Sequence, residues 1–185
     1  MVEEIIIAGI GGSLRNGSYN GFLLKACQKA MPQGSRLEIL NIANLPLYNQ
    51  DEENKPSAEV AEFKSGIRKA HGVLFVTPEY NYSVPGFLKN AIDIASRPVS
   101  ENPFMEKPAG IMSASMGQFG GMRAQYHLRQ ILVYLDMAPI QKPEIFVSGA
   151  HAVFDAEGNI TDADLAKRIA QYMAKLVDRS RKLKA

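Results

Sequence analysis

A short segment rich in glycine and hydroxyl side chains follows the first apolar run of the chain. The run is Ile5-Ile6-Ile7, and the segment reads Gly9-Ile-Gly-Gly-Ser-Leu-Arg-Asn-Gly-Ser-Tyr-Asn20. Glycines allow a backbone to turn tightly and to approach a bound anion, and the N-terminus of a following helix adds partial positive charge. This order of strand, glycine loop and helix predicts a site for a phosphate group.

Two common phosphate-binding patterns do not fit this segment. The dinucleotide-binding pattern Gly-x-Gly-x-x-Gly needs glycine at Leu14, and the P-loop pattern beginning at Gly12 needs lysine at Ser18. The remaining loop has one guanidinium with hydroxyl and amide groups, which suits a terminal monophosphate and points toward FMN. We expect the phosphate to be held by Ser13, Arg15, Ser18, Tyr19 and Asn20. A plain strand–helix connection without ligand is the alternative, and Arg15 with its neighbouring serines argues against it.

Apolar runs and segments with a 3.6-residue period alternate along the chain. Strands are expected at 5–10, 36–42, 72–77, 108–114 and 139–147, and helices at 18–31, 57–70, 85–96, 119–135 and 162–181. Strands that are apolar on both faces belong to parallel sheets covered by helices on each side. Residues 1–185 are therefore predicted to form a single domain, a three-layer α/β/α sandwich around a five-stranded parallel sheet in the flavodoxin-like order 2-1-3-4-5.

In this strand order ligands bind beyond the carboxyl ends of the strands, where the order reverses. The loops after the first, third and fourth strands are therefore expected to build the site. The loop at 77–86 contains two prolines that stiffen it, with two tyrosines, a carboxylate and an amide between them. The loop at 113–121 contains three glycines, which allow backbone N–H groups to approach the polar edge of a ring. Together these two loops predict a site for a planar ring.

Composition and charge exclude several other classes of protein. The chain is 46% hydrophobic and 22% charged with a net charge of +2, which gives no electrostatic footprint for nucleic acid. No apolar run approaches the roughly 20 residues of a membrane span, and the acidic start Met-Val-Glu-Glu is unlike a signal peptide. The single cysteine, Cys27, is predicted to be a small buried hydrophobe, and three scattered histidines make no metal-ligand spacing. We expect a cytoplasmic protein with no metal, nucleic-acid or membrane partner.

Three motifs in order match a known family. They are Gly12-Ser-Leu-Arg-Asn-Gly-Ser-Tyr-Asn20, Pro78-Glu-Tyr-Asn-Tyr-Ser-Val-Pro-Gly-Phe-Leu-Lys-Asn-Ala-Ile-Asp93 and Ser115-Met-Gly-Gln-Phe-Gly-Gly121. Over nearly its whole length the chain resembles the NADPH-dependent FMN reductases of flavodoxin-like fold, a group that contains bacterial quinone, chromate and azo-dye reductases. The resemblance implies that the first loop holds the FMN phosphate.

The same resemblance implies how the flavin ring is held. It places the ring beside Pro78, Glu79, Tyr80 and Asn81, and its polar edge near Ser115, Met116 and Gly117. It also implies a homodimer or homotetramer with the flavin near a subunit interface. The aromatic residues Tyr80, Tyr82 and Phe119 would fit such an interface.

The expected chemistry belongs mostly to the cofactor. NADPH or NADH delivers a hydride, the oxidised nucleotide leaves and a small-molecule acceptor takes its place, which is a ping-pong scheme. Backbone amides of Gly117–Gly121 are expected to stabilise negative charge on reduced flavin, and no side chain is expected to be catalytic. Arg15 and Arg123 are candidates for the 2′-phosphate of NADPH. Quinones, free flavin, chromate and azo compounds all remain open as acceptors.

Two other functions are weighed against this one. A flavodoxin-like electron carrier without NADPH activity is the first, but such carriers tend to be strongly acidic, whereas this chain has a pI near 8.6. A serine esterase is the second, suggested by Gly12-Ser13-Leu14 and by Ser113-x-Ser115-x-Gly117. The first esterase pattern needs aspartate where Ser148 precedes His151, and the second needs glycine at Ser113. Both patterns are incomplete.

Overall fold

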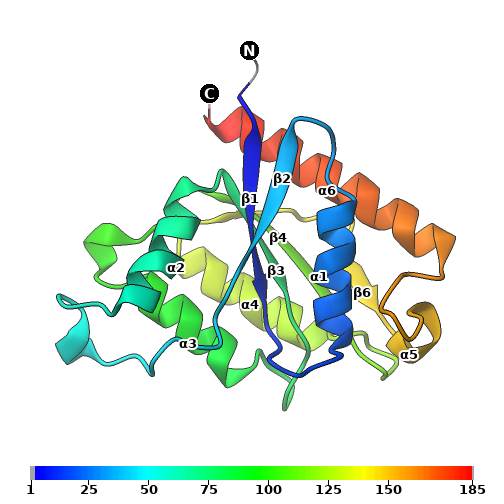
Figure 1. Ribbon diagram of the computed structural model, residues 1–185, viewed down its shortest axis with the longest axis horizontal. Coiled ribbons are helices and arrows are strands. Elements are labelled where there is room, and N and C mark those ends of the chain that lie inside the picture. Colours follow the sequence, from blue (N-terminus) through cyan, green and yellow to red (C-terminus); the bar gives the residue numbers. More distant parts are fainter. Residues whose placement is uncertain (1–2, 185) are drawn as a thin grey trace.

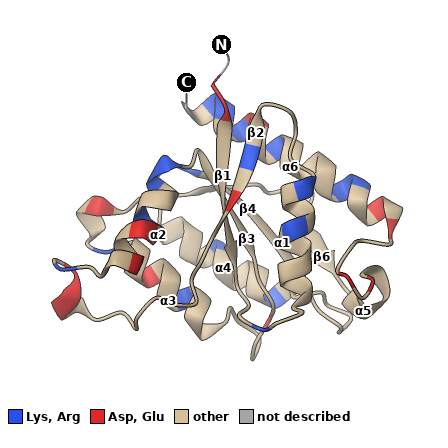
Figure 2. Cartoon of the chain, viewed as in Figure 1, with Lys and Arg blue, Asp and Glu red and all other residues tan. Residues whose placement is uncertain are grey.

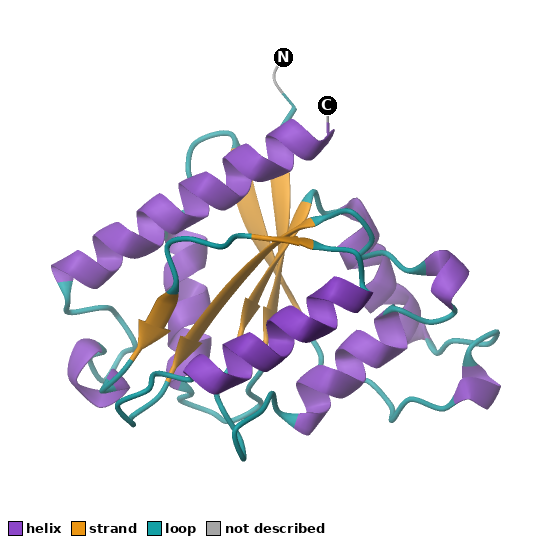
Figure 3. Cartoon of the chain, turned by 180° about the vertical axis from the view of Figure 1, so that it is seen from behind, coloured by secondary structure: helices purple, strands orange, loops and turns teal. Residues whose placement is uncertain are grey.

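A parallel sheet between two layers of helices forms the frame of the protein. The computed structural model describes residues 3–184, and Figures 1 and 3 show the strands enclosed by helices. The strands are β1 (Ile5–Gly11), β2 (Ser35–Leu40), β3 (Gly72–Val76), β4 (Pro108–Ala114), β5 (Ala138–Pro139) and β6 (Ile145–Val147). The helices are α1 (Tyr19–Lys29), α2 (Ala58–Lys69), α3 (Gly86–Ala95), α4 (Met122–Tyr134), α5 (Ala150–Val153) and α6 (Ala163–Lys184), with short 3-10 turns at Gln50–Glu52 and Val99–Glu101. This is the predicted three-layer α/β/α sandwich.

Alternate residues of each central strand enter two separate hydrophobic cores. In β1, Ile5 and Ile7 pack with α1 and α6, whereas Ala8 and Ile10 pack with α2, α3 and α4. Whereas the outer strand β2 has exposed residues, β3 and β4 are buried at every residue. This double burial explains why these strands read as continuous apolar runs rather than as alternating patterns.

The predicted strand order is confirmed, because the sheet runs β2-β1-β3-β4-β5 with all strand pairs parallel. The prediction of one strand at 139–147 is wrong. Two short strands, β5 and β6, stand there instead, and each pairs with a different part of β4. Pro139 and Pro143 lack the N–H group that a continuous ladder needs, so the segment leaves the sheet between them.

A tyrosine from α6 fills the gap between β5 and β6. The Tyr172 hydroxyl accepts a hydrogen bond from the Ile111 N–H at 2.9 Å and donates to the Ile111 carbonyl at 3.3 Å. Ile111 lies between the part of β4 that pairs with β5 and the part that pairs with β6. The buried hydroxyl therefore satisfies backbone groups that a continuous fifth strand would otherwise pair.

The two edges of the sheet at which the strands begin and end have different surroundings. The start of β1 and the end of α6 lie at one edge of the sheet, and the loops after β1, β3 and β4 meet at the opposite edge (Figure 1). In Figure 2 the lysines, arginines and acidic residues are spread along the helices, whereas the ribbon at the loop edge is mostly uncharged. No helix within residues 3–184 is both long and apolar enough to cross a membrane.

Candidate functional site

Three loops converge where β1, β3 and β4 end. The first is the phosphate loop, residues 12–18, the second is the aromatic hairpin, residues 78–83, and the third is the glycine loop, residues 115–121. Backbone hydrogen bonds connect the strand ends from which these loops leave. The Gly12 N–H donates to the Val76 carbonyl at 2.8 Å, and the Thr77 N–H donates to the Met112 carbonyl at 3.0 Å. A Cβ at Gly12 would lie 2.7 Å from Thr77 Oγ1, so glycine is required for this approach.

The phosphate loop presents unpaired backbone donors at the start of α1. Ser18 caps this helix, its Oγ accepting from the Gly21 N–H. The N–H groups of Asn16, Gly17 and Tyr19 meet no acceptor among residues 3–184. Orphan N–H groups at the N-terminus of an 11-residue helix form a cradle for an anion, so the residues present fit the phosphate of FMN.

The Arg15 side chain folds back onto the phosphate loop. Its guanidinium donates to the Gly17 carbonyl at 2.9 Å and to the Asn16 carbonyl at 3.4 Å, and it lies 5.9 Å from the centre of the Tyr19 ring. Ser13 Oγ accepts from the Arg15 N–H at 3.4 Å. Ser13, Arg15, Ser18 and Tyr19 thus lie close together on one loop. Their binding of a phosphate stays a prediction.

Asn20 has a different position from the other members of the predicted set. It is buried, its Nδ2 donates to the Ala114 carbonyl at 2.8 Å, and its Oδ1 accepts from the Ala114 N–H at 2.9 Å. Ala114 is the last residue of β4, directly before the glycine loop. The Asn20 amide therefore ties α1 to the start of the glycine loop and has both of its polar atoms occupied by the protein.

The aromatic hairpin is a two-residue turn with an unusual backbone. Tyr80 and Ser83 exchange two backbone hydrogen bonds of 3.0 Å, and the residues between them, Asn81 and Tyr82, have φ values of +50° and +66°. Two positive φ values define a type I′ turn, in which asparagine is favoured but tyrosine is strained. The Tyr80 ring is 45% exposed and meets the Phe87 ring edge-on at 6.4 Å.

The Glu79 carboxylate is hydrogen-bonded to the first turn of α4. Its carboxylate accepts from the Arg123 N–H at 2.9 Å, from the Ala124 N–H at 3.3 Å and from the Arg123 guanidinium at 2.9 Å. A carboxylate at this position satisfies orphan N–H groups and complements the helix dipole. Glu79 therefore holds the hairpin against α4. The placement of Pro78, Tyr80 and Asn81 beside a flavin ring stays a prediction.

The glycine loop is shaped by its own hydrogen bonds. Ser115 Oγ accepts from the Gly117 N–H at 3.1 Å, and the Met116 side chain is 66% exposed. Gly120 and Gly121 have φ values of +57° and +84°, and α4 begins only at Met122, so the predicted helix start at 119 is three residues early. A Cβ at Gly121 would lie 2.7 Å from the Ser113 Cβ, so the close approach of this loop to β4 needs glycine.

The histidines do not complete a hydrolase triad. Ser13 and Ser115 accept hydrogen bonds from backbone N–H groups of their own loops, and Ser113 Oγ is buried between the Gly120 carbonyl and the Gln125 amide. The described residues show no histidine bonded to these three serines. The serine esterase alternative therefore has no geometric support at the residues that suggested it.

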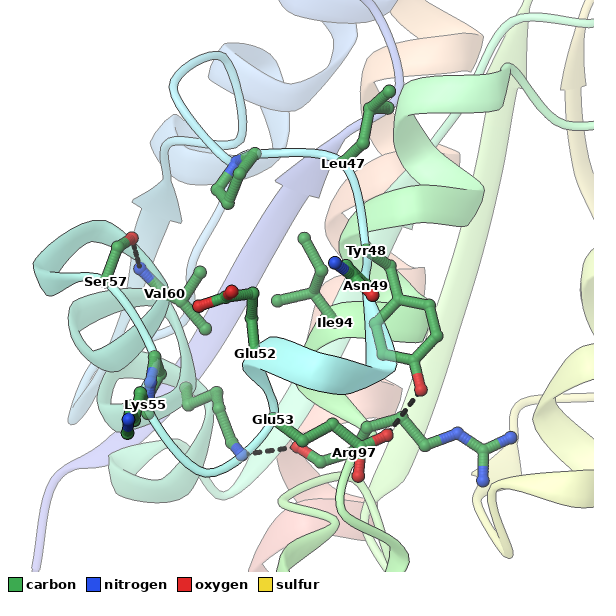
Figure 4. Close-up of a pocket in the computed structure, with 13 residues that line it drawn as sticks. Leu47, Tyr48, Asn49, Glu52, Glu53, Lys55, Ser57, Val60, Ile94 and Arg97 are labelled. Atoms are coloured by element: carbon green, nitrogen blue, oxygen red, sulfur yellow. Dashed lines mark hydrogen bonds between the residues drawn. The ribbon is translucent and has the colours of Figure 1, made fainter.

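A cavity of about 350 Å³ lies away from the loop edge. Figure 4 shows it beneath the segment 46–57, against α2 and α3, with Tyr48, Val60 and Ile94 among its walls. Asn90 holds this segment, accepting from the Tyr48 N–H and donating to the Pro46 carbonyl, both at 2.8 Å. None of the residues predicted to bind FMN lines this cavity. This cavity is therefore separate from the residues predicted to bind FMN.

Sequence reasoning missed the residues that connect the loops. From the sequence, Arg123 is expected only as a contact for the 2′-phosphate of NADPH, and no pattern predicts the pairing of His127 Nδ1 with Ser83 Oγ at 3.0 Å. Glu79 and Arg123 are 44 residues apart, so no local pattern links them. The one available signal is the placement of Arg123 in the first turn of a helix that follows a glycine pair.

Comparison with known proteins identifies the family. The family model described as NADPH-dependent FMN reductase matches residues 5–152. An NAD(P)H-dependent FMN reductase of Pseudomonas aeruginosa is 49% identical over 178 residues, or 95% of each chain. A quinone reductase of Escherichia coli strain K12 is 48% identical over 153 residues, or 80% of each chain.

A solved structure agrees with these sequence matches. The flavoenzyme FerB, an NAD(P)H:(acceptor) oxidoreductase from Paracoccus denitrificans, aligns with a TM-score of 0.89 and 34% identity, covering 96% of this chain and 98% of that one. The predictions of an enzyme, of FMN as cofactor and of NAD(P)H as electron donor are confirmed by the family match. With its glycine cradle, its strand order and its matched residues in agreement, the chain belongs to the NADPH-dependent FMN reductase family.

Proposed function

We propose that this protein passes electrons from NADPH or NADH to small planar acceptors through one bound FMN, and that quinones are the main acceptors. The quinone reductase of Escherichia coli among its relatives supports that acceptor class. Bound flavin supplies the two-electron chemistry, accepting hydride from the nucleotide and reducing the acceptor. Free flavin, chromate and azo compounds are further acceptors within this proposal.

The observation that carries the proposal is the row of unpaired N–H groups at Asn16, Gly17 and Tyr19, beside the Arg15 guanidinium. These groups would bind the FMN phosphate, with the hydroxyls of Ser13 and Ser18 bordering the loop. Binding of a phosphate by these backbone donors would need little reorganisation of the protein, because the Arg15 guanidinium already holds the loop in shape through the Asn16 and Gly17 carbonyls.

The other two loops would hold the ring of the flavin. Pro78, Tyr80 and Asn81 lie on the stiff hairpin, and the backbone of Ser115, Met116 and Gly117 lies on the glycine loop. The Ser115 and Gly117 N–H groups already donate to the Val147 carbonyl and to Ser115 Oγ. The Met116 N–H would therefore donate to the ring edge that gains negative charge on reduction. With no side chain required as acid, base or nucleophile, these residues bind and orient.

Flavin binding and turnover test the proposal together. Purified protein titrated with FMN should quench flavin fluorescence and saturate at one FMN per chain. With NADPH and a benzoquinone as substrates, ping-pong turnover predicts parallel double-reciprocal lines. Failure to bind FMN refutes the proposal, and intersecting lines refute its kinetic scheme. NADPH oxidation in the absence of any protein partner separates the enzyme from a simple electron carrier.

The surface near the site supports assembly into a homodimer or homotetramer. Tyr82 and Phe119 are 65% and 45% exposed, and Tyr126 on α4 is 45% exposed. Exposed aromatic side chains gathered on one face favour a protein interface. Sedimentation velocity measures the assembly directly, and a monomer at micromolar concentration contradicts this part of the proposal. We also place the protein in the cytoplasm, where its single cysteine stays reduced.

A further inference from the structure

We propose that Arg123 is a positioning residue that locks the aromatic hairpin against the glycine loop and thereby fixes the flavin ring for hydride transfer. The inference rests on the proposed function, because it assigns a role within the same site. It goes beyond that function by naming a residue that neither holds the phosphate nor reaches the reacting atoms. Its support comes from the contacts of Arg123 on both loops.

The first contact is an ion pair with the hairpin. Arg123 Nη1 lies 2.9 Å from Glu79 Oε1, and the two side chains are 32% and 12% exposed. The same carboxylate also accepts from the backbone N–H of Arg123. One acidic group of the hairpin therefore binds both the backbone and the side chain of the first turn of α4, which gives a stiffer link than a single surface ion pair.

The second contact is with aromatic rings from both loops. The Arg123 guanidinium carbon lies 4.1 Å from the centre of the Tyr82 ring on the hairpin and 4.4 Å from the centre of the Phe119 ring on the glycine loop. These distances are well within the range of a cation–π interaction. Arg123 is thus the common neighbour of the two loops that are proposed to hold the ring.

The strained turn at the hairpin tip explains why such a lock is needed. Tyr82 has a φ of +66°, a conformation that persists only when its surroundings hold it. The guanidinium over the Tyr82 ring and the hydrogen bond between His127 Nδ1 and Ser83 Oγ both attach this turn to α4. Without Arg123 the turn can relax, and the hairpin residues Tyr80 and Asn81 would move with it.

Lysine cannot replace arginine in this arrangement. A lysine at position 123 would keep the charge opposite Glu79, but a compact ammonium group does not lie flat over two rings while it binds a carboxylate. Arg123→Lys therefore separates the charge of the residue from its shape. Phe119→Leu removes the aromatic ring of the glycine loop that the guanidinium contacts, and it leaves the ion pair with Glu79 in place. It therefore tests the same contact between the two loops independently.

The matched control lies at the far edge of the sheet. Arg68 is at the C-terminal end of α2, directly before β3 begins, and it forms a surface pair with Glu101 at 3.2 Å. Arg68→Lys makes the same chemical change at a residue far from the three loops. It should behave as the wild type in every measurement.

Three measurements on protein loaded with FMN test the inference. They are the FMN dissociation constant, the rate of flavin reduction by NADPH in a stopped-flow instrument, and the visible circular dichroism of the bound flavin. Because the phosphate cradle is untouched, Arg123→Lys and Phe119→Leu should change the dissociation constant by less than about threefold. The reduction rate should fall about tenfold or more, since a small misplacement of reacting groups slows transfer strongly. The flavin dichroism should change in both variants.

A reduction rate and a dichroism spectrum like those of the wild type, in either variant, would overturn the inference while leaving the proposed function intact. Failure of the wild-type protein to bind FMN would overturn both. Equal losses in Arg68→Lys would also overturn it, because the effect would then not belong to the loops. Far-UV circular dichroism of each variant records that it is folded.

Discussion

Replacing Asn20 tests how the first loop is joined to the rest of the site. The sequence places this residue with the phosphate ligands, but in the structure its amide is buried and bonded to both backbone groups of Ala114. Asn20→Ala removes the donor and the acceptor together. The N–H and the carbonyl of Ala114 are then left without partners at a residue that is 2% exposed.

The size of the effect follows from these two bonds. An unsatisfied buried polar group costs about 1–3 kcal/mol, so two such groups cost about 2–6 kcal/mol. Alanine is better than asparagine in a helix by about 0.5 kcal/mol, which offsets a small part of the loss. The space left by the amide can admit a water molecule that bonds Ala114. We therefore expect the free energy of unfolding to fall by about 2–3 kcal/mol.

Urea unfolding of the protein without flavin measures this loss, because bound ligand would add its own stabilisation. The transition is followed by far-UV circular dichroism, and the slope with urea should stay unchanged. Asn54→Ala is the matched control, since Asn54 is exposed and should change stability by less than about 0.5 kcal/mol. A loss below about 0.5 kcal/mol in Asn20→Ala would refute the reasoning.

Three further predictions concern a ligand contact, a buried hydroxyl and a buried thiol. Arg15→Ala should raise the FMN dissociation constant about 10- to 150-fold, the worth of a charge-assisted hydrogen bond, as measured by fluorescence titration. Burial raises the pKa of Tyr172 to about 12. Its neutral form therefore stabilises the fold fully below pH 10, and this contribution is lost as the pH rises from about 10 to about 12. Tyr172→Phe should cost about 1–3 kcal/mol at neutral pH and decline less steeply over that alkaline range in urea titrations. Burial also raises the pKa of Cys27, so a thiol reagent at pH 8 should label the protein only in denaturant.

Each of these has a clear contrary result. An unchanged dissociation constant would remove Arg15 from the site. A parallel alkaline decline in Tyr172→Phe and the wild type would show that the hydroxyl is not held neutral by the fold. Rapid labelling of Cys27 in buffer would show that the core beneath α1 opens readily.

The main strands and helices could be predicted because their signals are local. Apolar runs such as Gly72–Val76 and the helical period of α2 need no knowledge of distant residues. The prediction of a single fifth strand is wrong because the apolar residues at 139–147 favour one strand, whereas Pro139 and Pro143 interrupt it. The hydroxyl that bonds the backbone of β4 at the resulting gap belongs to Tyr172, on a helix more than 20 residues later. No local sequence pattern predicts this contact.

The site shows the same division between local and distant information. Glycine and serine in the phosphate loop act through their own backbone, so residue type and spacing predict the cradle. For Asn20 and Glu79 the type suggested a polar ligand contact, but the direction of each side chain is set by Ala114 and by α4. Direction depends on how elements pack, which a sequence pattern does not contain.

The start of β1 and the end of α6 lie at the edge of the sheet opposite the three loops, which has a practical consequence (Figure 1). An affinity tag, a fluorescent reporter or a tether to an electrode can be fused at either end without covering the three loops. Immobilised in this way, the protein would present its electron-exchanging side outward to dissolved substrates.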